Sequence, residues 1–405
     1  MTEASGARLV PVRPADACEA SGGRAGDGGA AALAARLRSI RSRGGVPLVG
    51  DDRWSPRQWD DILRTCADAS PPDDAAWAGL TSGSGGFPRV VMRSAASWSD
   101  SFGAAERLLG ATGDDVVLLP SPPVSSLTLF SLAHSLEGGP RPVLAEACGT
   151  GTGPASTVPD AAEATLFHGT PQALRRLIDA GAPPRLRAAL VGGSGLDARL
   201  RRDAASRGIR VVSYYGAAEL SFVAVDDDGE GYRPFPGVEL RTRDGELWVR
   251  SAFVASGYLP VAGGRGPGPL RSENGWHTVG DLAELAAGRL RLRGRGDGAI
   301  LTASATVVPE DVESVLRGLP GIADALVLGL PRAGVGALVA AVVEPADPAS
   351  PPSAAALRRA TRELLAPSHR PRRWFAAELP RTANGKPARS VAAGLVAAGE
   401  VARLA

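Results

Sequence analysis

Residues 115–214 alternate short apolar runs with segments of helical composition, and this alternation restricts the possible folds more than any other feature of the sequence. The run 115–120 is apolar and β-branched, which is typical of a buried strand in a parallel sheet. The strands predicted after it lie at 164–167, 186–191 and 210–214, and the helices at 171–179 and 196–206. Strands that alternate with helices in this way predict layered α/β subdomains.

The composition is that of a globular protein with room for more than one core. Of the 405 residues, 44% are hydrophobic and 22% are charged, which is ordinary for globular domains. Lys and Arg number 45 against 43 Asp and Glu, so the net charge is +2. This near-balance argues against a nucleic-acid partner, and we interpret the local basic cluster of Arg370, Arg372 and Arg373 as a solvated face.

Cysteines and apolar runs bear on the compartment of the protein. Cys18, Cys66 and Cys148 are odd in number and far apart, so they indicate neither a disulfide framework nor a metal cluster, and we expect a reducing, cytoplasmic location. The longest apolar run, 325–343, is interrupted by Pro331 and by glycines. It therefore predicts two buried strands around a turn rather than a membrane span, and we expect no membrane insertion.

The N-terminal segment shows little regular pattern. Residues 1–30 are rich in Gly, Ala and Asp without a sustained period, so we expect at least part of this segment to be poorly ordered. Helical composition follows at 31–43, and the Ser55-Pro56 pair precedes a second amphipathic helix predicted at 54–66.

The stretch 80–89 reads Leu-Thr-Ser-Gly-Ser-Gly-Gly-Phe-Pro-Arg and joins hydroxyl side chains to glycines. Such a run suits a turn that surrounds phosphate oxygens with backbone N–H groups, although Gly- and Ser-rich runs are more often plain surface loops. The nucleotide-triphosphatase type of loop is excluded because Phe87 stands where that type requires Lys, and the glycine spacing excludes a dinucleotide-binding turn. The candidate phosphate-binding residues are Thr81, Ser82, Gly83, Ser84, Gly85 and Gly86.

This stretch resembles the T-S-G-[ST]-T-G-x-P-K-G signature of the adenylate-forming superfamily, which includes acyl-CoA synthetases, adenylation domains and luciferases. Gly85 replaces a Thr of that signature, Arg89 replaces its Lys and Val90 replaces its last Gly. The resemblance implies that the loop binds ATP phosphates and that Arg89 supplies a catalytic cation. The segment before the loop is short for the superfamily.

Two glycine-containing stretches extend the resemblance to the adenine site. Residues 190–195 read Leu-Val-Gly-Gly-Ser-Gly and resemble the turn that covers one face of adenine in the superfamily, although an ordinary strand-to-helix turn has the same composition. Residues 214–219 read Tyr-Tyr-Gly-Ala-Ala-Glu and resemble Y-G-x-T-E, with Ala218 in place of Thr. The implied adenine-binding residues are Gly193, Ser194, Gly195, Tyr214, Tyr215 and Gly216, and Glu219 is the implied ligand of Mg²⁺.

The segments that follow match further motifs in order. The stretch 245–250 and Gly257–Tyr258 resemble a segment of structural role. Asp281 ends a Thr-Val-Gly-Asp match, and its carboxylate would accept hydrogen bonds from the ribose hydroxyls. Gly294-Arg295-Gly296-Asp297 resembles the superfamily hinge, which implies that Arg295 reaches the ribose and that the chain swivels at Asp297.

The hinge implies a two-domain architecture. We expect a large N-terminal adenylate-forming domain of layered α/β subdomains at 31–294, a hinge at 295–298 and a small, mobile α+β lid domain at 299–405. Within the lid, 379–386 resembles L-P-x-T-x-x-G-K and ends in Lys386. The resemblance implies that Lys386 is catalytic.

The implied activity is ATP-dependent activation of a carboxylic acid. A carboxylate that attacks the α-phosphate of ATP brings two anions together, so the reaction needs positive charge rather than a general base. Mg²⁺, Arg89 and Lys386 would supply that charge. The acyl-adenylate would then pass to a thiol, either CoA or the phosphopantetheine of an acyl-carrier protein.

Within the superfamily the chain is similar to short o-succinylbenzoate:CoA ligases. The candidate acyl pocket consists of Ser125, Ser126, His168 and Ala217, although a structural histidine would explain His168 equally well. Two other hypotheses stay open: an enzyme that adenylates amino acids or loads a carrier protein, and a catalytically impaired nucleotide-binding protein, which Gly85 and Ala218 would favour.

Overall fold

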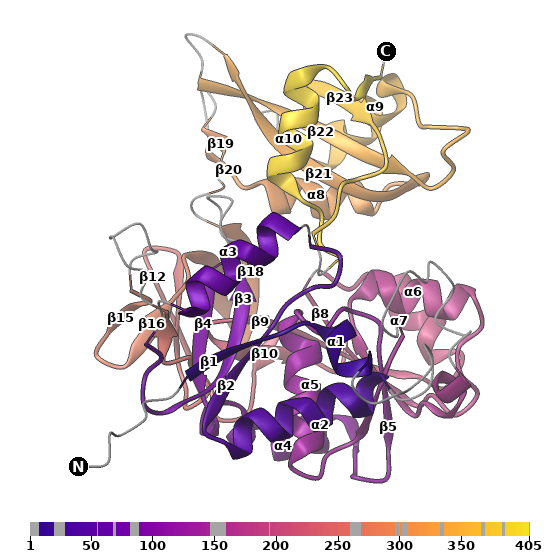
Figure 1. Cartoon of the computed structure of the whole chain (residues 1–405). Coiled ribbons are helices and arrows are strands. Elements are labelled where there is room, and N and C mark those ends of the chain that lie inside the picture. Colours follow the sequence, from indigo (N-terminus) through magenta and orange to yellow (C-terminus); the bar gives the residue numbers. More distant parts are fainter. Residues whose placement is uncertain are drawn as a thin grey trace. The chain divides into compact units, whose positions relative to one another are not determined.

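The computed structural model describes most of the chain in two compact units. The described residues are 8–19, 29–54, 56–67, 70–81, 89–145, 159–193, 195–259, 269–295, 298, 300–301, 306–332, 336–365, 369–382 and 385–404. The large unit comprises Met1–Leu240, Val249–Val279 and Ala383–Gly385. The small unit comprises Arg241–Trp248, Gly280–Thr382 and Lys386–Ala405. The mixed α/β class predicted from the sequence is confirmed (Figure 1).

A seven-stranded sheet is the larger sheet of the large unit, in the order β11-β10-β9-β8-β7-β5-β6. The strands from β6 to β9 are parallel, while β10 and β11 are antiparallel. Its strands are β5 (Val116–Leu119), β6 (Arg141–Leu144), β7 (Leu166–Gly169), β8 (Ala188–Gly192), β9 (Arg210–Ala217), β10 (Ser221–Asp226) and β11 (Arg233–Pro234). The four strands predicted from the alternation are confirmed as β5, β7, β8 and β9.

A five-stranded sheet has the order β1-β2-β3-β4-β14, with β1, β2 and β3 parallel and the other pairs antiparallel. Its strands are β1 (Arg8–Val12), β2 (Gly45–Val49), β3 (Ala75–Thr81), β4 (Arg89–Ser94) and β14 (Gly257–Tyr258).

Part of the N-terminal segment has regular structure. Residues 8–19 form β1 and helix α1 (Pro14–Glu19). Strand β1 gains its order from parallel pairing with β2 and from burial of Leu9 and Val12. The other residues of the segment before Gly29 lie outside the described part of the chain.

Helices separate the two sheets of the large unit. The helices are α2 (Gly29–Ser42), α3 (Pro56–Ala67), α4 (Ala96–Leu109), α5 (Ser126–Leu136), α6 (Pro171–Asp179) and α7 (Ala198–Ala205), with a 3-10 helix at Pro159–Glu163. Helices α2, α4 and α5 each contact strands of both sheets, so they form the middle layer. Helices α6 and α7 pack their apolar side chains on the other face of the seven-stranded sheet.

A third sheet follows in sequence, and the division between the two units runs through its strands β12 (Glu239–Arg243) and β13 (Glu246–Arg250). In the large unit, β15 (Arg271–Glu273) pairs with β16 (Trp276–Thr278). In the small unit, β17 (Asp281–Ala286) pairs with β18 (Arg289–Arg295).

The small unit is built on the sheet β21-β22-β23-β24. Its elements are β19 (Ile300–Leu301), β20 (Thr306–Val307), α8 (Pro309–Arg317), β21 (Ile322–Arg332), β22 (Gly336–Pro345), α9 (Ala354–Leu364), β23 (Arg373–Ala376), α10 (Arg389–Ala398) and β24 (Ala402–Arg403). Helices α8 and α9 pack on one face of the sheet and α10 on the other (Figure 1). The two buried strands predicted for the run 325–343 are confirmed as β21 and β22.

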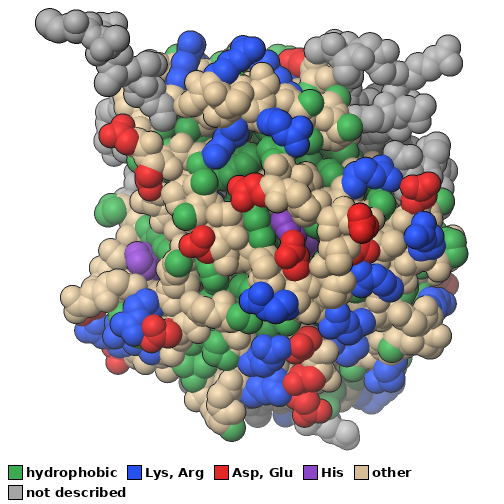
Figure 2. All heavy atoms as spheres, turned by 90° about the horizontal axis from the view of Figure 1, so that it is seen from below, with side chains coloured by type: hydrophobic (Ala, Val, Ile, Leu, Met, Phe, Trp, Pro, Cys, Tyr) green, Lys and Arg blue, Asp and Glu red, His purple; other side chains and the backbone are tan. Residues whose placement is uncertain are grey.

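Two further observations concern the distribution of charged side chains on the surface and the length of the helices. On the face drawn in Figure 2, basic and acidic side chains are interspersed rather than segregated. Within the described residues, no helix has the length and apolar character needed to cross a membrane.

Candidate functional site

The two ends of the candidate phosphate loop meet on neighbouring strands. Thr81 ends β3 and Arg89 begins β4, and these two residues pair directly across the antiparallel ladder. Residues 82–86 and the side chain of Thr81 lie outside the described part of the chain. The strands thus fix where the loop begins and ends.

Glu219 lies in the tight connection between β9 and β10. Gly216 is required there because a Cβ atom would lie 2.2 Å from the carbonyl oxygen of Ser221, which itself has a φ of +59°. The carbonyl oxygen of Glu219 accepts a hydrogen bond from the N–H of Ala255 at 2.7 Å. The side chain is 9% exposed, and its Oε1 accepts a hydrogen bond from the Tyr258 hydroxyl at 2.8 Å.

Tyr258 connects Glu219 to Arg89. The guanidinium carbon of Arg89 lies 5.5 Å from the centre of the Tyr258 ring, within range of a cation–π contact. Burial and the neighbouring Glu219 raise the pKa of Tyr258 to about 12, while a hydrogen bond with Arg89 opposes that rise. The hydroxyl therefore stays protonated at neutral pH and acts as the donor to Glu219.

Arg93 holds the turn that carries Glu219 from inside the unit. Its side chain is 2% exposed, and it donates two hydrogen bonds to the carbonyl oxygen of Ala218, at 2.6 and 3.1 Å. It also donates to the carbonyl oxygen of Phe253 at 2.8 Å and to the Ser97 hydroxyl at 3.2 Å. Burial lowers the pKa of Arg93 to about 9, and the charge of Glu219 opposes this lowering. Arg93 thus remains a cation at neutral pH.

The candidate adenine residues occupy the carboxyl ends of β8 and β9, where ligands commonly bind in parallel sheets. Gly192 pairs with Tyr214, and a Cβ atom on Gly192 would lie 2.3 Å from the Tyr214 ring. That ring also packs edge-on against Phe222, and burial raises the pKa of Tyr214. Tyr215 points to the opposite face of β9 because side chains alternate along a strand.

The turn after β8 and the end of β9 hold the other candidates of this region. Gly193 has a φ of +88°, a left-handed conformation that favours glycine. Gly195 follows on the described chain, and Ser194 lies outside it. Ala217 ends β9 and pairs with Ser221 across the connection that carries Glu219.

The candidate acyl pocket involves α5 and β7. Ser125 is the N-cap residue of α5 and Ser126 its first residue, and one turn further on Ser131 meets His168 of β7. The Ser131 hydroxyl donates to the carbonyl oxygen of Leu127 at 2.9 Å. It must therefore accept from His168 Nδ1 at 2.9 Å, which assigns the proton of the imidazole to Nδ1.

His168 is neutral and buried. It is 3% exposed, and burial lowers its pKa to about 3, assisted by the proximity of His134. Its Nε2 atom is buried and has no hydrogen-bond partner among the described residues. His134 in turn lies 2.9 Å from a Glu106 carboxylate oxygen and stacks on Phe102. The position of a neutral histidine beside α5 is compatible with both the pocket and the structural interpretation.

A cluster of metal ligands does not occur in the described part of the chain, in which no three His, Cys, Asp or Glu side chains come together to hold an ion. Glu219 nevertheless suits a hard cation shared with phosphate oxygens. The described residues give one donor to its Oε1, Tyr258, and none to its Oε2. The carboxylate of Glu219 thus fits as a ligand of a Mg²⁺ ion that is bound together with a nucleotide.

The small unit carries the remaining candidates. Asp281 begins β17 and pairs with Arg295 of β18, so the two candidate ribose residues are neighbours. The side chain of Arg295 and all of Asp297 lie outside the described residues. Lys386 is exposed on the loop between β23 and α10.

The sequence motifs did not indicate the contacts of two residues in the large unit. Tyr258 was assigned to a structural segment, yet its hydroxyl binds Glu219. Arg93 received no role, although a single arginine after the apolar Val90-Val91-Met92 run is a signal that a buried charge needs partners.

Comparison with known proteins identifies a family. The sequence model of the AMP-binding enzyme family matches residues 3–259, and that of the AMP-binding enzyme C-terminal domain matches residues 311–386. A probable 2-succinylbenzoate–CoA ligase of Mycobacterium tuberculosis is 33% identical over 333 residues, which cover 78% of this chain and 82% of that protein. An uncharacterized acyl–CoA ligase of Bacillus subtilis is 28% identical over 364 residues, 82% of this chain and 71% of that protein.

Solved structures share the fold. A variant of Escherichia coli MenE with bound OSB-AMS aligns with a TM-score of 0.77 at 20% identity and covers 97% of this chain and 88% of that one. ATP-bound MatB from Rhodopseudomonas palustris aligns with a TM-score of 0.73 at 20% identity, over 97% of this chain and 96% of that one.

Proposed function

Because the chain belongs to the AMP-binding enzyme family, we propose that Glu219, Arg89 and Lys386 serve the ATP-dependent activation of a small carboxylic acid. The chain is an AMP-forming acid:thiol ligase of the acyl-CoA synthetase type, which forms an acyl-adenylate, releases pyrophosphate and transfers the acyl group to a thiol. The observation that carries the residue assignment is the position of Tyr258, whose hydroxyl donates to the Glu219 carboxylate and whose ring lies against the guanidinium of Arg89.

The charges of the large unit suit adenylation. Two anions must meet when a carboxylate attacks the α-phosphate, so fixed positive charge and N–H groups lower the barrier. Arg89 and the backbone of 81–86 would bind the phosphates. Glu219 would hold Mg²⁺, which neutralises phosphate charge when bound. Glu219 would need no movement for this role, because Tyr258 and Arg93 already fix its side chain and its main chain.

The nucleoside contacts are proposed residue by residue. In the large unit Tyr215 would stack on adenine, since the Tyr214 ring is already packed against Phe222, and Gly193, Ser194, Gly195 and Gly216 would leave room for the base. In the small unit Asp281 and Arg295 would bind the ribose. Lys386 would bridge the carboxylate and the α-phosphate during adenylation, and rotation about Asp297 would remove it before thiol transfer.

Two further proposals concern the residues that bind the acyl substrate and the identity of the acceptor thiol. Ser125, Ser126, His168 and Ala217 would line the acyl pocket. A neutral histidine that offers an unprotonated Nε2 cannot pair with a second carboxylate as a cation, so we do not assign o-succinylbenzoate itself. CoA would be the acceptor, and the phosphopantetheine of an acyl-carrier protein is the alternative. We also propose a cytoplasmic location, from the odd number of widely separated cysteines.

Pyrophosphate exchange tests this function. The purified protein should exchange labelled pyrophosphate into ATP only when Mg²⁺ and an accepted acid from a panel of aryl, acyl, dicarboxylic and amino acids are present. Glu219→Gln should abolish Mg²⁺-dependent exchange, whereas Glu239→Gln, at an exposed ion pair with Arg250, should not change it. AMP binding without exchange across the whole panel would instead support an impaired nucleotide-binding protein.

A further inference from the structure

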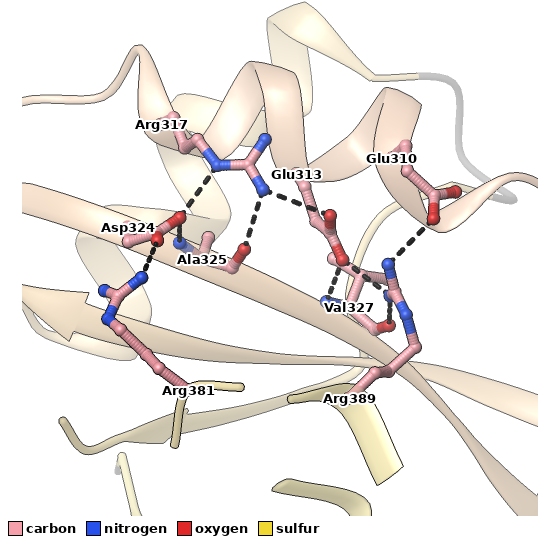
Figure 3. Close-up of polar contacts among 8 residues, drawn as sticks. All are labelled: Glu310, Glu313, Arg317, Asp324, Ala325, Val327, Arg381 and Arg389. Atoms are coloured by element: carbon pink, nitrogen blue, oxygen red, sulfur yellow. Dashed lines mark hydrogen bonds and ion pairs between the residues drawn. The ribbon is translucent and has the colours of Figure 1, made fainter. Parts of the chain in front are cut away.

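Two arginines flank Lys386 in sequence and fasten its loop to the small unit. We propose that Arg381 and Arg389 are positioning residues for Lys386 and serve the adenylation half-reaction through it. This inference rests on the proposed role of Lys386. Figure 3 shows both arginines pointing from the loop and from α10 toward the acidic side chains of α8 and β21.

Arg381 fastens the start of the loop to the sheet. Its guanidinium donates to Asp324 Oδ2 of β21 at 3.0 Å and to Glu344 Oε2 of β22 at 2.7 Å. The same Glu344 oxygen accepts the N–H of Leu379 at 3.0 Å. The Arg381 side chain is only 17% exposed, so its contacts are largely shielded from water.

Arg389 fastens the end of the loop to α8 and β21. Its Nη1 atom donates to Glu313 Oε1 and to the carbonyl oxygen of Val327, both at 2.6 Å, and its Nη2 donates to Glu310 Oε1 at 2.8 Å. Glu313 is 3% exposed, and its Oε1 also accepts the N–H of Val327 at 2.8 Å. Arg389 is the first residue of α10, so this network fixes the point where the loop becomes helix.

Main-chain bonds link the two anchors across the loop. The N–H of Thr382 donates to the carbonyl oxygen of Lys386, and the N–H of Ala388 donates to that of Pro380, both at 2.7 Å. Arg381 and Pro387 also form an antiparallel bridge. The backbone of Lys386 is therefore part of a short ladder with an anchored arginine at each end. A displacement of about 1 Å in a group that acts on the transition state can cost up to about a hundredfold in rate.

The small unit contains a matched control for this network. Arg317 of α8 pairs with Glu313 at 3.2 Å and with Asp324 at 2.8 Å, the same two carboxylates that Arg389 and Arg381 bind. Within the described part of the chain its contacts do not reach the loop, since its third hydrogen bond goes to the carbonyl oxygen of Ala325. Loss of Arg317 thus disturbs the same carboxylates without releasing Lys386.

Hydrogen exchange tests the positioning without a substrate. In Arg381→Met and Arg389→Met, the amides of Thr382 and Ala388 should exchange at least about tenfold faster than in the parent protein. In Arg317→Met they should exchange at the parent rate. Equal acceleration in all three variants would overturn the proposal, because the network would then stabilise the unit as a whole rather than the loop.

The two half-reactions test the consequence. With the acid that exchanges fastest in the pyrophosphate screen, Arg381→Met and Arg389→Met should lower adenylation about ten- to a hundredfold and leave thioester formation from supplied acyl-adenylate within about twofold. Adding either change to Lys386→Ala should lower adenylation no further, because both act through Lys386. Multiplied losses in the double variants would overturn the positioning.

The outcomes separate this inference from the function on which it rests. If Lys386→Ala adenylates at the parent rate, the proposed role of Lys386 fails, and the proposed mechanism must be revised. If Lys386→Ala is impaired while Arg381→Met and Arg389→Met keep full activity, the positioning alone is overturned. If no acid supports exchange, the proposed function fails, and hydrogen exchange still decides whether the arginines hold the loop.

Discussion

The connection that carries Glu219 and the loop that carries Lys386 are both held by arginines, but in different ways. Arg93, in the large unit, is 2% exposed and donates mainly to the main-chain carbonyl oxygens of Ala218 and Phe253. Arg381 and Arg389, in the small unit, are 17% and 32% exposed and donate mainly to carboxylates. The first arrangement fixes the backbone inside a core, and the second fixes a loop at the edge of one.

The difference predicts unequal tolerance to change. A buried carbonyl oxygen, such as that of Phe253, has no water to replace a lost donor. The backbone beside Glu219 therefore depends strongly on Arg93, while Tyr258 holds the Glu219 side chain. In the small unit the polar contacts are spread over several residues, because Glu313 binds both Arg317 and Arg389 as well as a main-chain N–H. We therefore expect changes around Glu219 to cost stability and changes around Lys386 to cost mainly rate.

Arg93→Met should have the largest effect on stability. It leaves the buried carbonyl oxygen of Phe253 and the half-buried carbonyl oxygen of Ala218 without their donor and Glu219 without a neighbouring cation, which should cost about 3 to 5 kcal/mol of unfolding free energy. Urea unfolding followed by tryptophan fluorescence measures this, with Arg317→Met as the matched change in the small unit. Similar losses in the two variants would remove the contrast between the regions.

Tyr258→Phe should have an intermediate effect. It removes the hydroxyl that holds Glu219 Oε1, a hydrogen bond to a charged group worth about 1.5 to 3 kcal/mol, and it leaves the aromatic contact with Arg89. The Mg²⁺ concentration for half-maximal pyrophosphate exchange should rise, with a smaller change at saturating Mg²⁺. An unchanged Mg²⁺ dependence would mean that Glu219 needs no such support.

Near neutral pH the smallest effect should be a pH dependence that originates at His168. Burial lowers its folded pKa to about 3 from an ordinary 6.5, so between these values the unfolded chain binds a proton that the folded chain does not. Stability should therefore fall as pH falls through this window, by at most about 1.4 kcal/mol per pH unit from this group. His168→Asn, whose amide can still donate to Ser131, should show a shallower fall. Identical pH profiles would assign the acid sensitivity to other groups.

The sequence predicted the parts of the fold that local pattern determines. Helix α6 was predicted at 171–179 and forms there, because a proline at its start and one apolar face suffice to define it. Helix α5 was not predicted. Residues 127–134 are all buried, including the polar Thr128, Ser131 and His134, so the helix has no exposed polar face over that stretch. Strand β1 was missed because its order comes from its partner β2.

In the candidate site, too, local sequence patterns did not predict contacts between distant residues. Glu219 and Arg89 were found because each lies in a local motif, whereas Arg93 acts on Ala218, 125 positions away in the chain. A motif cannot report a contact of that kind, since only the fold brings β4 beside the connection after β9. Tyr258 was missed in the same way, because it stands 39 positions from the carboxylate it binds. The sequence therefore indicated the charged candidate residues Glu219 and Arg89. The structure added Arg93 and Tyr258, which position Glu219.

The most direct test of the account compares both half-reactions in Lys386→Ala. If Lys386 acts only in adenylation, the variant should lose about 10² to 10³ in the rate of pyrophosphate exchange, the scale for one preorganised group aimed at the transition state. Its rate of thioester formation from chemically supplied acyl-adenylate should stay within about twofold of the parent protein. Equal losses in both half-reactions, or no loss in either, would contradict the account.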